Sequence, residues 1–276
     1  MTVLVTGTTG NVGAEVVGAL VAAGSPVRGL VRGIPAGLPL GVQYAVGDLN
    51  EPHSFGPALY QARGLFLLPG FRHTPELLEV AVRSGVERVV LLSGPSAGSG
   101  DLTNAVTRYM VESEQAVRAS GLAWTILRPS GFMSNTLQWS AQLAAGDVVR
   151  VPFAQVPIAN VDPYDIAAVA VAALLQDGHQ GAVHRLTGPR ALLPADRLAV
   201  LGAVLGRDLR LEAQSDDEAR AEMSRTTPVE YVDAFFDFYV AGSLDDSQVN
   251  STVQEVTGRP ARTFEQWAAA HAGSFR

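Results

Sequence analysis

A glycine motif near the start of the chain constrains its fold more than any other feature. The segment VLVTGTTGNVG, residues 3–13, places Gly7, Gly10 and Gly13 after an apolar strand-like run and before a helix-like stretch over residues 11–23. Gly7 permits a tight turn, Gly10 lets the backbone approach a pyrophosphate, and Gly13 lets the helix pack on the strand. The helix would offer the phosphates its free N–H groups and the positive end of its dipole.

The plain alternative is a glycine-rich turn that binds nothing. The strand–turn–helix context favours a dinucleotide-binding turn instead. The residues expected to contact the cofactor here are Gly7, Thr9, Gly10, Asn11, Val12 and Gly13.

The first half of the chain alternates short apolar runs with amphipathic segments. Continuous apolar runs suit parallel strands that are buried on both faces, and alternation with helices predicts βαβ units. The expected strands are Val3–Thr6, Val27–Val31, Val42–Val46, Leu65–Leu68, Val89–Leu92, Trp124–Leu127 and Ala182–Thr187. The expected helices are Asn11–Ala23, Thr74–Ser84, Thr103–Ser120 and Asp162–Leu175. We therefore predict an α/β fold with a Rossmann-like, doubly wound parallel sheet.

The pattern loosens after Pro129, and the later sequence is richer in polar, helix-like segments. We expect residues 1–130, completed by about 160–188, to form the nucleotide-binding domain. Residues 131–159 and 189–276 would form a smaller, mostly helical lobe that binds the substrate over the carboxyl edge of the sheet.

Composition excludes several classes of protein. The chain has no cysteine, so thiolate catalysis, disulfides and cysteine metal sites are ruled out. All 20 basic residues are arginines, and they face 27 acids for a net charge of −7, which is unlike a nucleic-acid-binding domain. The five histidines form no metal-binding spacing, and no apolar run is long enough to span a membrane. We expect a cytoplasmic monomer or homodimer without a metal.

Two positions after the second and third strands bear on cofactor choice. Arg32 follows the second strand without an adjacent acid, where an NAD-selective protein usually carries a carboxylate for the ribose. A guanidinium can pair with a 2′-phosphate, so NADPH is the expected cofactor, with NADH as the alternative. Asp48 and Leu49 would lie near the adenine, although Asp48 also suits a turn. Pro69 and Gly70, after the fourth strand, are further expected contacts.

The chain resembles the NmrA-like branch of the atypical short-chain dehydrogenases over nearly its whole length. The resemblance rests on TGTTGNVG, on GDL at 47–49, on SGLAWTILRPSGFMSN at 120–135, on VDPYDIA at 162–168, on LTGP at 186–189 and on the final VTGRPARTFEQWAAAHAGSF. It implies a Rossmann domain, a small substrate lobe and NADP(H). Members include quinone, ketone and imine reductases, and regulators that sense NADP without turning it over. The chain also resembles ketoreductases that tailor aromatic polyketide antibiotics.

Related reductases hold the carbonyl oxygen with a serine and with the tyrosine of Tyr-x-x-x-Lys. This chain offers Ser93 and Tyr109 as the matching catalytic residues, with Ser93 also expected near the cofactor, but Ser113 stands where the lysine would be. Free tyrosine has a pKa of about 10 and is already protonated at neutral pH. Positioned proton transfer contributes about 10²–10⁴-fold, so losing the lysine weakens the acid without preventing hydride transfer.

Loops after the fourth and sixth strands are expected to line the substrate pocket, although core packing is the plain alternative for each aromatic. The expected substrate contacts are Phe71, Phe132, Met133, Asn135 and Trp139. Residues 231–239 are dense in aromatic side chains and would form either a lid or packing between lobes. Together these features predict an NADPH-dependent reductase of a ketone or quinone on a small aromatic molecule; the rival hypothesis is a non-catalytic NADP sensor.

Overall fold

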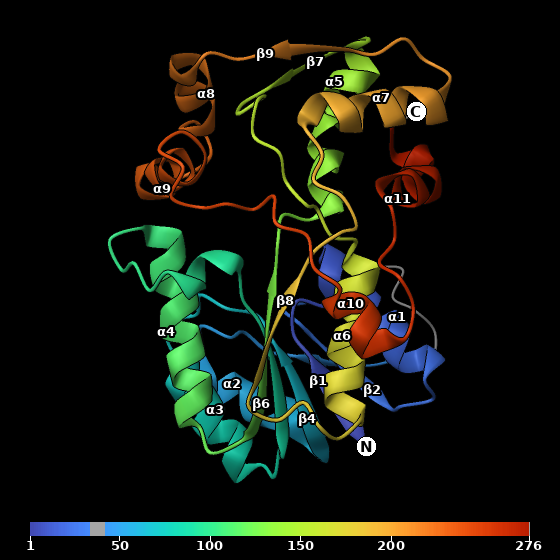
Figure 1. Cartoon of the computed structure of the whole chain (residues 1–276). Helices are drawn as coiled ribbons and strands as arrows, with labels where there is room; N and C mark the ends of the chain where they lie inside the picture. Colours follow the sequence, from blue (N-terminus) through green and yellow to red (C-terminus); the bar gives the residue numbers. More distant parts are fainter. Residues whose placement is uncertain (34–41, 276) are drawn as a thin grey trace.

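A seven-stranded parallel sheet forms the centre of the computed structural model, which describes residues 1–33 and 42–275 (Figure 1). Its strand order is β3-β2-β1-β4-β5-β6-β8, and every neighbouring pair runs parallel. The strands are β1 (Thr2–Val5), β2 (Val27–Val31), β3 (Gln43–Val46), β4 (Ala62–Leu67), β5 (Arg88–Leu92), β6 (Ala123–Pro129) and β8 (Ala182–Leu186). The predicted Rossmann-like sheet is confirmed, and its order reverses at β1, beside which ligands bind in such sheets.

Helices cover both faces of the sheet because successive strand residues point to opposite sides. Val3 and Val5 pack into the cluster under α1 (Asn11–Ala22) and α6 (Pro163–Leu175). Leu4 packs into the cluster on the other face. That face is covered by α2 (Pro52–Phe55), α3 (Thr74–Arg83) and α4 (Ala105–Ala119).

The lobe lies above the sheet in Figure 1 and has a hydrophobic cluster of its own, built around Trp139 and Trp267. Its helices are α5 (Ser140–Ala145), α7 (Pro194–Leu205), α8 (Asp216–Met223), α9 (Val229–Tyr239) and α11 (Phe264–His271). The lobe is mostly helical, as predicted. It also contains a two-stranded parallel sheet of β7 (Val148–Val151) and β9 (Arg210–Ala213), which the sequence pattern did not indicate. The division of the chain into two domains stays a prediction, because residues of the later sequence such as Val253 also pack into the cluster under α1 and α6.

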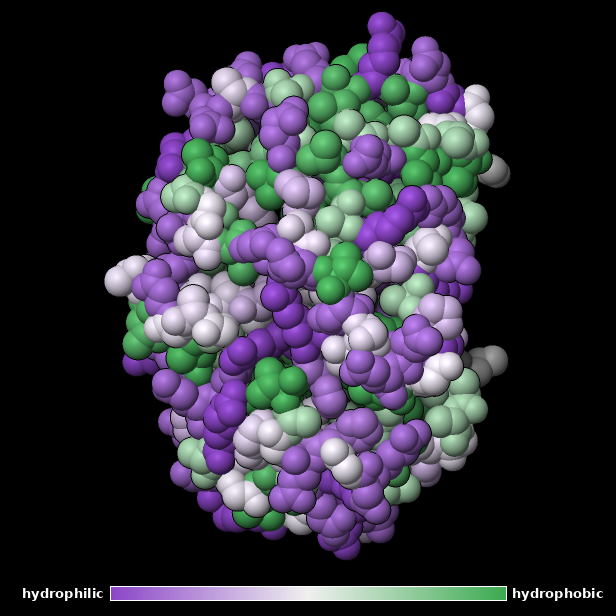
Figure 2. All heavy atoms as spheres, viewed as in Figure 1, coloured by the Kyte–Doolittle hydropathy of each residue, from purple (hydrophilic) through white to green (hydrophobic). Residues whose placement is uncertain are grey.

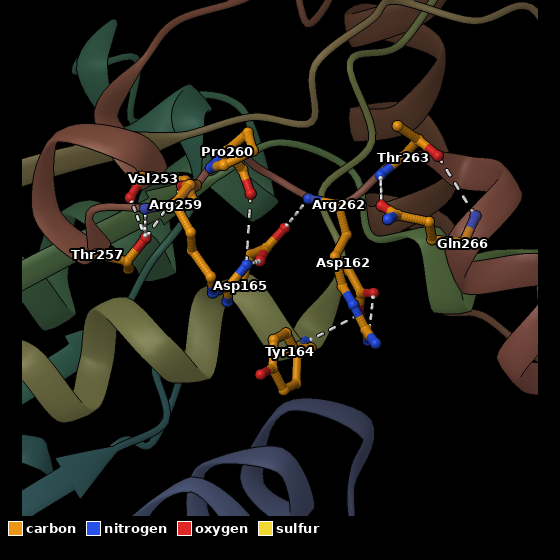
Figure 3. A network of polar contacts seen from close by, with 10 residues as sticks. All are labelled: Asp162, Tyr164, Asp165, Val253, Thr257, Arg259, Pro260, Arg262, Thr263 and Gln266. Atoms are coloured by element: carbon orange, nitrogen blue, oxygen red, sulfur yellow. Dashed lines mark hydrogen bonds and ion pairs between the residues drawn. The ribbon is translucent and has the colours of Figure 1, made fainter.

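The C-terminal segment returns from the lobe to the sheet, where α10 (Thr252–Thr257) packs against α6. Figure 3 shows how the following residues attach to the start of α6. Arg259 Nη1 donates to Asp165 at 2.6 Å, and the backbone N–H of Arg262 donates to the other carboxylate oxygen at 2.7 Å. Both guanidinium groups lie over the ring of Tyr164. Asp165 is fully buried, so these contacts compensate a charge that would otherwise be costly to bury.

The surface seen in Figure 2 is mainly hydrophilic around the sheet, and hydrophobic side chains gather on the upper half, over the lobe. No helix of the described ranges is both long and apolar enough to cross a membrane.

Candidate functional site

The glycine motif forms the tight turn between β1 and α1 that its spacing predicts. Gly7 adopts φ +64°, and the N–H of Gly10 donates to the carbonyl of Gly7 at 2.9 Å. A Cβ on Gly13 would lie 2.1 Å from that same carbonyl oxygen, so only glycine allows α1 to approach the turn this closely. Thr6, directly before the turn, fixes it from below: its hydroxyl donates to the Phe66 carbonyl and accepts from the N–H of Leu68, both at 3.0 Å.

The turn fits the pyrophosphate of a dinucleotide. Gly10 caps α1 without a side chain, so no capping oxygen occupies the space in front of the first helical turn. A Cβ on Gly10 would meet only the Gly7 carbonyl, at 3.3 Å, which leaves its other side open for close approach. The first N–H groups of a helix provide donors and a positive dipole end to an anion.

A cavity of about 530 Å³ lies between the turn and the ends of β2 and β3. We refer to it as the cradle cavity. It brings together Gly7, Thr9, Arg32, Asp48 and Leu49, all of which were predicted to bind the cofactor. Arg32 is exposed and has no ion pair among the described residues. Asp48 accepts from the backbone N–H of Asn50 at 2.8 Å, so it orders its loop while lining the cavity.

A second cavity of about 530 Å³ lies in the lobe, and we call it the lobe cavity. Asn11, at the start of α1, is among its lining residues, so both cavities border the same turn. The predicted substrate residues Asn135 and Trp139 line it, together with Phe153, Phe235 and Tyr239. Phe235 and Tyr239 are stacked, with an interplanar angle of 11°.

The other predicted substrate residues lie elsewhere. Phe71 lines the cradle cavity, Phe132 packs against the core under α1 and α6, and Met133 is buried in the lobe cluster. Within α9, Phe236 and Phe238 are buried, whereas Phe235 and Tyr239 face the lobe cavity. Some aromatic residues of this helix are therefore packed in the interior, and others face the cavity, as a lid would.

The hydroxyl of Ser93, at the end of β5, points to a buried carboxylate. It donates to Glu114 of α4 at 2.7 Å. Arg128 forms a two-point ion pair with the same carboxylate, at 2.8 and 2.6 Å, and Arg118 adds a third contact at 3.0 Å. These partners outweigh the effect of burial and lower the pKa of Glu114. Ser93 does not line either cavity described above, so its catalytic role stays a prediction.

Tyr109 lines a third cavity, of about 470 Å³, between α3, α4 and α9. Its ring packs edge-on against Tyr231, with centroids 6.2 Å apart. Burial, followed by Tyr231, raises the pKa of Tyr109. Ser113 accepts from the N–H of Gly70 at 3.0 Å and donates to the Tyr109 carbonyl at 2.7 Å, so it ties the Gly70 loop to α4. Phe71 joins this cavity to the cradle cavity, but Tyr109 does not line the lobe cavity.

Sequence reasoning missed three titratable groups of the lobe. Arg197 and Tyr239 line the lobe cavity. Asp246 is buried and accepts at 3.0 Å from the N–H of Gly131, which is itself a lining residue of that cavity. Burial is the main cause that lowers the pKa of Arg197 to about 10. Burial, followed by Asp246, raises the pKa of Tyr239 to about 12. The tyrosine lay in the aromatic run already noted, but nothing local marked Arg197.

The model of a protein family described as NAD(P)H-binding matches residues 7–177, which is more than half of the chain. The chain belongs to this family. The match begins at Gly7 and spans the cradle cavity and every strand of the sheet from β2 to β6.

Two curated relatives cover 99% of this chain and 99% of their own length. The (4-alkanoyl-5-oxo-2,5-dihydrofuran-3-yl)methyl phosphate reductase of Streptomyces griseus is 40% identical over 279 residues. The NAD(P)H azoreductase of Xenophilus azovorans is 35% identical over 283 residues. The predicted enzyme class, an NAD(P)H-dependent oxidoreductase, is therefore confirmed.

A solved structure supports the fold. The NADPH-dependent quinone oxidoreductase of Escherichia coli, complexed with NADPH, has a TM-score of 0.78 and 22% identity, and the match covers 98% of this chain and 99% of that one. The likeness extends over both the sheet and the lobe.

Proposed function

We propose that the chain reduces a conjugated carbonyl compound, such as a quinone, an aromatic ketone or an unsaturated lactone, with NADPH as the hydride donor. One observation carries the proposal: the cradle cavity and the lobe cavity border the same glycine turn, at Gly7–Thr9 and at Asn11 respectively. The aromatic lining of the lobe cavity suits a flat, conjugated molecule. The Streptomyces relative acts on an oxo-dihydrofuran and the solved neighbour on quinones, which are compounds of this kind.

The residues of the cradle cavity would hold the cofactor. The N–H groups at the start of α1 would hold the pyrophosphate, Arg32 the 2′-phosphate, and Asp48 the adenine amino group. Bound NADPH supplies the hydride. The protein supplies placement and exclusion of water, since the lobe lies over the carboxyl edge of the sheet.

Within the lobe cavity, the hydroxyl of Tyr239 is the proposed hydrogen-bond donor to the substrate oxygen. Its pKa of about 12 keeps it protonated throughout the neutral range, so it is always available as a donor but is a weak acid. A conjugated acceptor tolerates a weak acid because its own π-system stabilises the negative charge left by hydride addition. The final proton can then come from water. The reaction would therefore not need the lysine that is missing from the Tyr-x-x-x-Lys position, where Ser113 stands.

The proposal is tested by following the absorbance of NADPH with the purified protein and a panel of quinones, unsaturated lactones and aromatic ketones. We expect acceptor-dependent oxidation of NADPH with the conjugated compounds, and little with an isolated aliphatic ketone of similar size. Faster reduction of the aliphatic ketone would contradict it, because the charge on that oxygen is not delocalised and needs a well-positioned proton donor while it forms.

A further inference from the structure

The lobe cavity contains an arginine that has no acidic partner in the described part of the chain. Arg197 is only 7% exposed, and no carboxylate among residues 1–33 and 42–275 lies within ion-pair distance of it. Its Nη1 donates a long hydrogen bond of 3.3 Å to the hydroxyl of Thr136, and its guanidinium lies 5.1 Å from the centre of the Trp139 ring. Its Nε is buried without a hydrogen-bond partner among the residues that the structure describes. Buried arginines are normally paired, because an uncompensated buried charge is strongly destabilising.

The position of Arg197 in its helix adds to this cost. Arg197 is the fourth residue of α7, which begins at Pro194, and both residues line the lobe cavity. A cation in the first turn is repelled by the positive end of the helix dipole. The arginine and the helix end therefore direct the same sign of potential at one part of the cavity. With its pKa of about 10, the guanidinium remains charged at neutral pH.

Two more polar atoms of the cavity lining also lack partners. The Ser134 hydroxyl and the side-chain amide oxygen Oδ1 of Asn160 are buried without a hydrogen bond to the described part of the chain. Buried polar groups are nearly always satisfied, so three such atoms around one cavity indicate a polar ligand or ordered water. Because Arg197 is positively charged, we expect that ligand to carry a negative charge.

We propose that Arg197 binds an oxyanion of the substrate, a phosphate ester or a carboxylate, at the α7 end of the lobe cavity. The planar guanidinium suits two-point recognition of such a group, and Ser134 can donate to it. This deepens the proposed function: the substrate would be a conjugated carbonyl compound carrying a negative charge, held with its flat part against Trp139, Phe235 and Tyr239. The phosphate in the substrate of the Streptomyces relative agrees with this chemistry.

The test measures anion binding without any turnover. Phenyl phosphate and benzoate are titrated by calorimetry into protein saturated with NADP⁺, so that the cradle cavity is already filled, and benzyl alcohol serves as the uncharged comparison. We expect at least one of the two anions to bind with 1:1 stoichiometry and the alcohol to bind at least about tenfold more weakly, as expected for a charge-assisted hydrogen bond. The tighter of the two anions identifies the oxyanion class.

Arg197→Gln should weaken binding of that anion by about tenfold or more. Arg210→Gln is the matched control, because Arg210 of β9 lies in the same lobe but outside the cavity. NADP⁺ affinity and the circular dichroism spectrum of each variant show that the fold is retained. If Arg197→Gln fails to fold, Arg197→Lys replaces it. This variant should bind that same anion more weakly than the wild type, because an ammonium group cannot make the two-point contact of a guanidinium.

Absence of anion binding to the wild type, or equal binding by wild type and Arg197→Gln, would overturn the inference. The proposed function fails separately. Anion binding without reduction of any acceptor would refute the reductase chemistry but leave the anion site intact. Reduction of neutral quinones without anion binding would refute the anion site but leave the reductase chemistry intact.

Discussion

The hydroxyl of Ser93 donates a hydrogen bond to the carboxylate of Glu114, and Ser93 does not line the cradle cavity or the lobe cavity. This bond joins the end of β5 to α4, and Arg128 of β6 joins the same carboxylate from the next strand. The serine that resembles a catalytic residue by its position after β5 is therefore engaged in an ion-pair network, in which it satisfies a buried charge.

Replacing Ser93 with alanine separates the structural role from the catalytic one. We expect a loss of about 1–3 kcal/mol in the free energy of unfolding, because the buried Glu114 oxygen loses a donor. We expect kcat with a reducible quinone to fall by less than about tenfold. Urea unfolding and steady-state kinetics measure the two effects. A fall of 10²-fold or more in kcat at unchanged stability would instead establish Ser93 as catalytic.

Arg32 should determine the preference for NADPH over NADH. It lines the cradle cavity and is exposed, so removing it costs the fold little. Arg32→Gln should weaken NADPH binding by about 10–100-fold, which is the value of a charge-assisted contact to the 2′-phosphate. NADH lacks that phosphate and serves as the internal control, so its affinity should change little. Fluorescence titration of both cofactors checks this, and a parallel loss of both affinities would show that Arg32 contacts another part of the dinucleotide.

Arg197 should lower the stability of the protein when no anion is bound. Arg197→Met keeps much of the side-chain length and removes the poorly paired buried charge, so we expect a higher Tm, by several degrees. Differential scanning calorimetry in a buffer free of phosphate and carboxylate measures it. A large fall in Tm would mean that the contacts of Arg197 with Trp139 and Thr136 hold the lobe together.

Asp246 should make stability depend on pH. Burial raises its pKa to about 6, whereas the unfolded carboxyl titrates near about 3.9. The native state therefore binds the proton more tightly, so this contribution to stability is full below pH ~4 and is lost as the pH rises through ~6. Asp246→Asn should abolish that decline and leave the variant more stable than the wild type at pH 7, by on the order of 3 kcal/mol. Urea unfolding between pH 4 and 7 tests this, and parallel profiles would refute it.

Local signals explain why the sheet could be predicted from the sequence. Apolar runs such as Val89–Leu92 and the spacing of Gly7, Gly10 and Gly13 carry their information within a few residues, and the structure has a strand or a turn at each. The strands β7 and β9 have only four residues each, and β9 alternates charged with apolar residues. Segments this short could not be distinguished from loops by their sequence pattern.

The polar residues of the site could not be predicted in the same way. Arg197 looks like a solvated helix residue, because the Trp139 ring and the Thr136 hydroxyl that enclose it lie about 60 positions earlier in the chain. Glu114 sits in a polar stretch of α4 and is buried only because β5 and β6 bring Ser93 and Arg128 to it. Such burial depends on tertiary packing, for which a single sequence carries no local signal.

The most direct test of the account compares Tyr239→Phe with Tyr109→Phe in the reduction of one conjugated acceptor by NADPH. Tyr239 lines the lobe cavity, whereas Tyr109 lines a separate cavity against Tyr231. We predict that Tyr239→Phe lowers kcat/KM by about 10–100-fold, the value of one hydrogen bond to developing charge, and that Tyr109→Phe changes it by less than about threefold. A loss in Tyr109→Phe with full activity in Tyr239→Phe would contradict the account and place the reaction beside α4.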